Sequence, residues 1–268
     1  MSNNLSCIAI LALVAPAFAH SQTFEIASIK PTDPAFTLRS IQMPLNDGLV
    51  TIRGLSLKEL IQFAWGNVGV GTGLHPSLIA GGPAWFDRDR YDIVARPEGS
   101  RIPSRDERKE MLKALLVERF QLMFHREIRQ TAVYALVVGK NGPRMNVRRP
   151  DDGGPPFSLP LVGLHMPGRN VSMAQLADIL QTLIPLTDPD RDDRPVLDQT
   201  GLAGTFDFDL AWAGDRTLSA GQGGQPADPS GAPDLFTAIE QQLGLRLETK
   251  RTPTEILVVD RAARPSGN

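Results

Sequence analysis

The residues that could do chemistry in this chain are few and lie far apart in the sequence. There are four histidines and a single cysteine, Cys7. His75 and His165 fall in predicted loops, without an acidic or histidine neighbour at the spacing of a metal site. His125 falls on the exposed face of a predicted strand, where a cross-strand surface contact is expected. These positions predict no catalytic residue, no metal site and no bound cofactor.

Regularly spaced acidic residues give one further candidate, a calcium loop. Asp188, Asp190 and Asp192 alternate as the first ligands of such a loop do. However, Asp193 takes the place of the glycine that makes the sharp turn, and Gln199 stands where a bidentate glutamate is needed. A solvated acidic loop is the expected structure. The sequence also lacks the Gly-x-Ser-x-Gly, Ser-x-x-Lys, His-Glu-x-x-His and Walker patterns.

The best candidates for ligand binding surround a tryptophan. Trp85 follows a Gly-Gly-Pro turn, and aromatic residues on such turns are frequent binding-surface residues. Asp87, Asp89 and Arg90 come soon after it, so these four residues are the expected binding site. An alternative is an acid/base hydrolase that uses Asp87, Asp89 and Asp92, which requires two of these carboxylates to face each other in a cleft.

Two segments with the same pattern predict the elements that position these residues. Residues 54–60 (GLSLKEL) and 170–176 (NVSMAQL) each place a serine three positions before Glu or Gln and begin an apolar stripe. That spacing predicts a capping box and an amphipathic helix in both places. Further blocks recur in the same order, YDIVA with FDFDL and LMF with LRL. The constant order predicts a tandem duplication.

The predicted fold is therefore α+β, with two tandem duplicated modules, each with two helices packed on one face of a small mixed β-sheet. Module one covers residues 24–147, and a linker rich in Pro and Gly covers 148–157. Module two covers 158–264 and contains a flexible insertion at 213–233, because that stretch has almost no apolar residue.

Each module should also contain a second helix and a hairpin of its own. Ser104 with Glu107 predicts the cap of one second helix, and Asp234 the start of the other. One hairpin is expected to pair residues 121–127 with 133–139, and the other is expected to pair 245–249 with 255–260.

The N-terminal segment predicts export. Residues 1–19 have no charged side chain, contain an apolar run too short to span a bilayer and end in Ala-Phe-Ala. This segment is expected to be a signal peptide cleaved near Ala19, which makes the protein periplasmic or secreted and removes Cys7. The net charge of −2 and the dispersed basic residues give no footprint for nucleic acid. No second segment approaches spanning length.

Several motifs together resemble a known family. They are FEIASIKP at 24–31, GGPAW at 81–85, DRYDI at 89–93, LLVERF at 115–120, YALVV at 134–138, DQTGL at 198–202 and LFTA at 235–238. The chain resembles a large acidobacterial paralogous family of exported proteins whose domain has no assigned function. Some members carry the domain behind a membrane metallopeptidase of the antibiotic-sensor type, which implies a sensing role outside the membrane. The helix-capping blocks are also similar to the short N-terminal modules of secretins and TonB-dependent receptors, which bind partner proteins.

These observations favour a non-catalytic binding or interaction module of the cell envelope, whose ligand is a protein, a peptide or a glycan. The alternatives are the exported hydrolase with Asp/Glu chemistry and a structural envelope component. Facing carboxylates with a perturbed pKa would favour the hydrolase.

Overall fold

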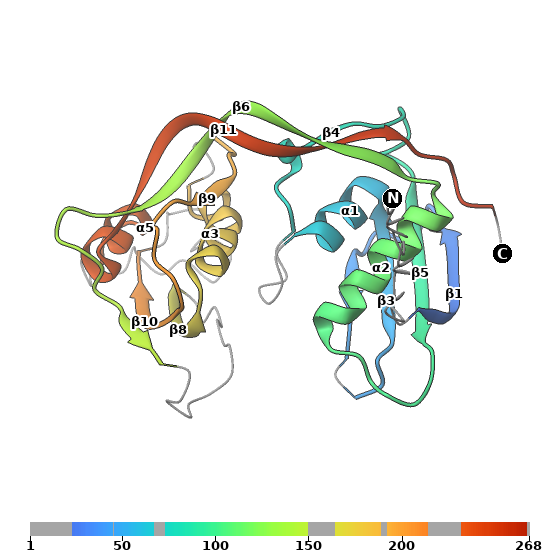
Figure 1. The fold of residues 1–268 in the computed structure, drawn as a ribbon, viewed down its shortest axis with the longest axis horizontal. Coiled ribbons are helices and arrows are strands. Elements are labelled where there is room, and N and C mark those ends of the chain that lie inside the picture. Colours follow the sequence, from blue (N-terminus) through green and yellow to red (C-terminus); the bar gives the residue numbers. More distant parts are fainter. Residues whose placement is uncertain are drawn as a thin grey trace, which may run out of the picture.

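The chain forms two lobes joined by a long two-stranded ribbon (Figure 1). The computed structural model describes residues 23–44, 46–66, 73–149, 164–188, 192–213 and 232–266. The expected signal peptide and nearly all of the expected linker and insertion lie outside the described residues. Within the described part of the chain, no helix is long and apolar enough to cross a membrane.

The first lobe is built on an antiparallel sheet with the strand order β1-β5-β3-β2. Its helices begin where the sequence predicts, because Ser56 caps α1 and Ser104 caps α2, each in a capping box with Glu59 or Glu107. Its elements are β1 (Phe24–Pro31), β2 (Ser40–Gln42), β3 (Val50–Ser56), α1 (Leu57–Trp65), the 3-10 turn η1 (Pro76–Leu78), β4 (Ile79–Gly81), β5 (Arg90–Pro97) and α2 (Arg105–Arg119).

The second lobe is built on a three-stranded sheet with the order β7-β10-β8. Ser172 caps its long helix, α3, in a capping box with Gln175, and Asp234 caps α5, so both predicted starts are confirmed. Its elements are β7 (Asn146–Arg148), β8 (His165–Val171), α3 (Met173–Thr187), β9 (Val196–Asp198), β10 (Thr205–Ala211), α5 (Leu235–Ala238) and the π-helical turn η2 (Ile239–Leu243).

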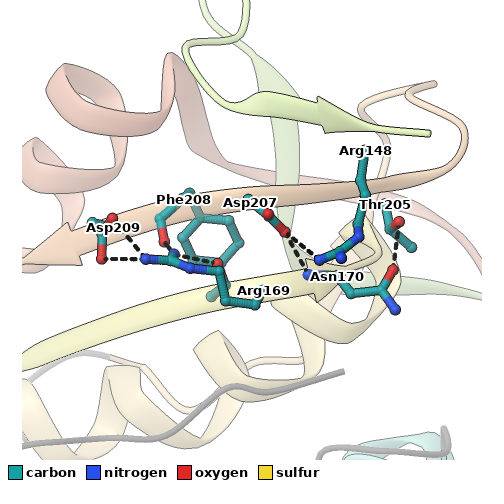
Figure 2. Close-up of polar contacts among 8 residues, drawn as sticks. Arg148, Arg169, Asn170, Thr205, Asp207, Phe208 and Asp209 are labelled. Atoms are coloured by element: carbon teal, nitrogen blue, oxygen red, sulfur yellow. Dashed lines mark hydrogen bonds and ion pairs between the residues drawn. The ribbon is translucent and has the colours of Figure 1, made fainter. Parts of the chain in front are cut away.

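The strand before each of the helices α1 and α3 bends two residues ahead of the serine cap. Gly54 in β3 and Asn170 in β8 have positive φ angles of 70° and 57°. An aspartate of the neighbouring strand fixes each bend: the Asp92 carboxylate accepts a hydrogen bond from the Gly54 N–H at 2.9 Å, and Asp207 accepts one from the Asn170 N–H at 2.7 Å. Figure 2 shows the second bend, where Arg148 also contacts Asp207. These contacts place both caps.

The ribbon shows that the two predicted hairpins are wrong. β6 (Met123–Val138) and β11 (Leu245–Arg261) are continuous strands that pair antiparallel along their whole length, from Leu245 opposite Val138 to Arg261 opposite Met123. Tight hairpin turns favour Asn and Gly, and the stretches expected to turn contain neither. Nothing there reverses the chain, so each strand runs on into the other lobe.

The ends of the ribbon complete the two hydrophobic cores. Leu257 and Val259 of β11 belong to the core of the first lobe, whereas Tyr134 and Leu136 of β6 belong to the core of the second. β4 adds to the ribbon parallel to β11, and β9 adds parallel to β6, giving a mixed sheet with the order β4-β11-β6-β9. Each lobe therefore depends on a strand from the other half of the sequence.

Candidate functional site

A cleft lies between the lobes, lined by residues of both. α1 and α3 are on the sides of the lobes that face each other beneath the ribbon (Figure 1). An inner recess of about 150 Å³ shares residues 73–75 and Gln181 with an outer space of about 350 Å³. Trp65 and Leu78 line the recess from the first lobe, and Asp178 and Asp198 line it from the second. Clefts between lobes are common places for small ligands, so this is the candidate site.

His75 connects the lobes at the edge of the cleft. It caps the η1 turn, and its Nδ1 accepts a hydrogen bond from the backbone N–H of Ser77 at 3.2 Å. A backbone N–H can only donate, so in the neutral ring the proton lies on Nε2, which donates to the Asp193 carboxylate at 2.9 Å. The His75 side chain is 4% exposed. This contact orients His75 and ties η1 to the loop before β9.

Ser77, His75 and Asp193 form a chain with the residue types of a nucleophilic triad. The Ser77 hydroxyl lies 2.8 Å from Nδ1 of His75. However, the backbone N–H of Ser77 shares that same nitrogen, which leaves its lone pair less available to take a proton from the hydroxyl. These three residues therefore form the cap of η1, with a further hydrogen bond from His75 to Asp193 of the second lobe.

Two glutamines shape the walls of the cleft. The Gln181 side chain of α3 donates across the lobes to the Gly73 carbonyl at 3.2 Å, and the Gln62 side chain of α1 donates to the Leu74 carbonyl at 3.1 Å. The backbone at position 73 passes so close to that of α1 that only glycine fits, because a Cβ at Gly73 would lie 2.8 Å from the backbone of Gln62. The amides are thus held in fixed orientations beside the recess.

A buried lysine stands behind one wall. Lys109 of α2 is 3% exposed; its Nζ donates to the Gly66 carbonyl at 2.7 Å and lies 5.3 Å from the Phe63 ring centroid. Burial first, and then the positive charge of Lys113, lower the pKa of Lys109 to about 8, while Asp178 of the second lobe acts in the opposite direction.

Three of the four predicted binding residues, Trp85, Asp87 and Asp89, lie at one turn, and none of them lines the cleft. The Trp85 ring packs against Tyr91 with centroids 6.5 Å apart, and the Arg264 guanidinium lies 5.2 Å over it. Arg264 also binds the Asp89 carboxylate at 2.7 Å. Asp87 is exposed on the same turn. An interaction with the C-terminal segment thus occupies Trp85 and Asp89.

The remaining residues named for this region have structural contacts. Arg90 begins β5 opposite Ser56, and its carbonyl accepts a hydrogen bond from the Thr32 N–H at 2.9 Å. The Asp92 carboxylate accepts from the Thr32 hydroxyl at 2.7 Å as well as from the bend in β3. Asp89 and Asp92 therefore bind separate partners and do not form the facing pair that a hydrolase needs.

The other histidines and the acidic loop contribute no metal centre in the part that the structure describes. No group of three His, Cys, Asp or Glu residues converges among the described residues. His125 is exposed and pairs across the ribbon with Asp260 at 2.9 Å, as expected for a surface strand position. His165 lies 3.5 Å from Asp209. Of the expected acidic loop, Asp190 lies outside the described residues.

Comparison with known proteins gives a family but no activity. No curated protein and no solved structure matches the chain. A family model matches residues 58–262, which include the second lobe, the ribbon and the first lobe from α1 onward, but not β1, β2 and β3. The chain therefore belongs to the family described as "Protein of unknown function (DUF3738)".

Proposed function

We propose that the protein is a non-catalytic binding module of the cell envelope that holds its ligand in the cleft between its two lobes. One observation carries this proposal: both lobes contribute oriented polar side chains to a single recess. Gln181 and His75 make hydrogen bonds across the lobes at its edge. Pre-oriented polar groups around a small cavity favour selective binding, because little side-chain freedom is lost when the ligand enters.

The competing hydrolase has less support. Of its three expected carboxylates, Asp89 binds Arg264, Asp92 binds the bend in β3, and Asp87 is exposed on the turn. The Asp193–His75–Ser77 chain has suitable residue types, but a backbone N–H shares the nitrogen that would serve as the base. Labelling of Ser77 by a fluorophosphonate probe would favour a hydrolase with a serine nucleophile over the binding module.

We also propose that the two lobes arose by tandem duplication, followed by exchange of their last strands. The support is that the same local structure occurs in both lobes: a bent strand is fixed by an aspartate and is followed by a serine-capped helix. The short strands add to the ribbon equivalently, β4 parallel to β11 and β9 parallel to β6. Superposing residues 49–140 on 164–260 should pair α1 with α3 and β6 with β11; a pairing of α1 with a strand would refute the duplication.

The export proposal rests on residues 1–19 and has a direct test. Mass spectrometry of the protein recovered from the envelope fraction should show the loss of residues up to Ala19 or slightly beyond. An intact Met1 on cytoplasmic protein would overturn export and the envelope role.

The cleft can be tested with a matched pair of variants. Ala174 is exposed on α3 and lines the recess, so Ala174→Trp should fill the recess without disturbing a core. Ala114 is exposed on α2 and lines neither part of the cleft, so Ala114→Trp is the control. Native mass spectrometry of the purified protein after incubation with envelope extract should show a bound mass. That mass should be lost in Ala174→Trp and kept in Ala114→Trp. If both variants retain it, the cleft is not the binding site, and the absence of any bound mass would favour a structural envelope component.

A further inference from the structure

We infer that the cleft takes a neutral sugar: one ring in the inner recess, and a second unit of the same glycan in the outer space. This inference rests on the binding function proposed above and names the ligand class for that site. It follows from the charges of the lining, the kinds of hydrogen-bonding groups it presents and the size of the recess.

The charges of the lining disfavour an anionic ligand. Among the described residues, those that line the two spaces include Asp178, Asp193 and Asp198 but no lysine or arginine. A phosphate, a sulfate or an acidic sugar would meet these carboxylates, whereas the ammonium groups of Lys109 and Lys113 lie over aromatic rings and do not line the cleft.

A cationic ligand is disfavoured for a different reason. Asp193 and Asp198 already have partners: Asp193 binds His75, and Asp198 accepts from the N–H and the hydroxyl of Thr200. The lining also includes the aromatic rings of Phe63 and Trp65, and an ammonium group lies near each: Lys109 at 5.3 Å from the Phe63 ring centroid and Lys113 at 5.9 Å from that of Trp65. A cationic ligand that entered the cleft would be repelled by these positive charges.

The remaining chemistry of the lining suits a polyol. Gln62 and Gln181 are held by bonds from their amide nitrogens to backbone carbonyls. Amides can donate to and accept from adjacent hydroxyl groups, whereas carboxylates only accept, and each carboxylate oxygen can accept more than one hydrogen bond. Trp65, Leu74 and Leu78 supply apolar surface in the same recess, against which the C–H face of a sugar ring can pack.

The size of the recess separates a sugar from a peptide. An extended peptide rises about 3.3 Å per residue and needs an elongated groove or a free strand edge. The inner recess is about 150 Å³ and opens into a space of about 350 Å³. Typical small-molecule clefts begin at about 300 Å³, so the inner recess fits a single ring-sized group with its continuation in the outer space.

The test compares defined probes on the purified protein and on the variants Ala174→Trp, Ala114→Trp and Gln181→Ala. Isothermal titration uses maltose, cellobiose and chitobiose as neutral sugars, spermidine as the cation, inorganic phosphate as the anion and tri-alanine as the peptide. The expected result is binding of at least one neutral sugar. Ala174→Trp should abolish that binding, Gln181→Ala should weaken it by about tenfold through the loss of one hydrogen bond, and Ala114→Trp should leave it unchanged.

Other outcomes separate the ligand class from the proposed function. If spermidine, phosphate or tri-alanine binds, no sugar does, and Ala174→Trp abolishes that binding, the sugar inference falls while the binding function stands. Sugar binding that survives Ala174→Trp would overturn the recess as the site. If no probe binds and the mass captured from envelope extract is not a sugar, the inference also falls. If no probe binds and extract yields no captured mass, the binding function itself falls.

Discussion

Because the lobes exchange strands, the structure predicts which lobe loses stability when a single core residue is mutated. Leu257 comes from the second half of the sequence but is 4% exposed in the core of the first lobe. Leu257→Ala removes three buried carbon atoms, which costs about 2.4 kcal/mol of transfer free energy at about 0.8 kcal/mol each. The cavity left behind brings the expected loss of unfolding free energy into the range of about 2–5 kcal/mol.

Hydrogen exchange measured by mass spectrometry locates this loss. Leu257→Ala should speed amide exchange in α1 and β3 of the first lobe more than in α3 and β10 of the second. The matched variant is Leu136→Ala, because Leu136 is 0% exposed in β6 and belongs to the core of the second lobe. It should have the opposite distribution, with faster exchange in α3 and β10. Urea unfolding of both variants gives the total loss of stability.

The opposite pattern would refute the exchanged arrangement. If β11 instead folded back on the second lobe as a local hairpin, Leu257→Ala would speed exchange in α3 and β10 and leave α1 and β3 unchanged. Fast exchange at 126–131 and 250–255 in the unmodified protein would likewise contradict the continuous pairing of β6 with β11.

Three further predictions concern the cleft, the strand bend and the buried lysine. Gly73→Ala should destabilise the protein by about 1–3 kcal/mol, because its Cβ would lie 2.8 Å from the Gln62 backbone; an unchanged melting temperature would contradict the tight contact. Asp207→Ala should cost about 1–3 kcal/mol by leaving the Asn170 N–H without its acceptor, and thermal unfolding checks this value. Because the pKa of Lys109 is lowered to about 8, the folded protein releases this proton before the unfolded chain does. The contribution of Lys109 to stability should therefore rise from about pH 8 toward its ordinary pKa of 10.5. The difference in urea midpoint between the protein and Lys109→Met should change over that pH range and stay constant below it.

Local patterns in the sequence were sufficient for the helices. A serine followed three positions later by Glu or Gln determines which N–H groups are capped, and the apolar stripe determines which face is buried. α1, α2 and α3 accordingly begin at the predicted serines, and the predicted stripes of α1 and α3 are buried. These features depend on residues within one or two turns of each other, so they can be read without the fold.

The strand partners and the cleft could not be predicted in this way. Alternation of Leu245 and Leu247 with charged residues indicates a strand but is equally compatible with a local hairpin and with a partner in the other lobe. The aromatic turn around Trp85 was the expected site, but it packs against Arg264 near the C-terminus. The hydrogen bond between His75 and Asp193 joins residues 118 positions apart, and no local pattern marks such a pair.

The sequence by itself determined the α+β class, the start of each long helix, the face that α1 and α3 bury and the family to which the chain belongs. These properties arise from short-range hydrogen bonding and side-chain periodicity, which act within a single element. The tertiary structure alone decided that β6 and β11 exchange ends between the lobes and that α1, η1 and α3 enclose a common recess. Both depend on long-range contacts, where many pairings satisfy the same local pattern and the burial of whole cores selects among them.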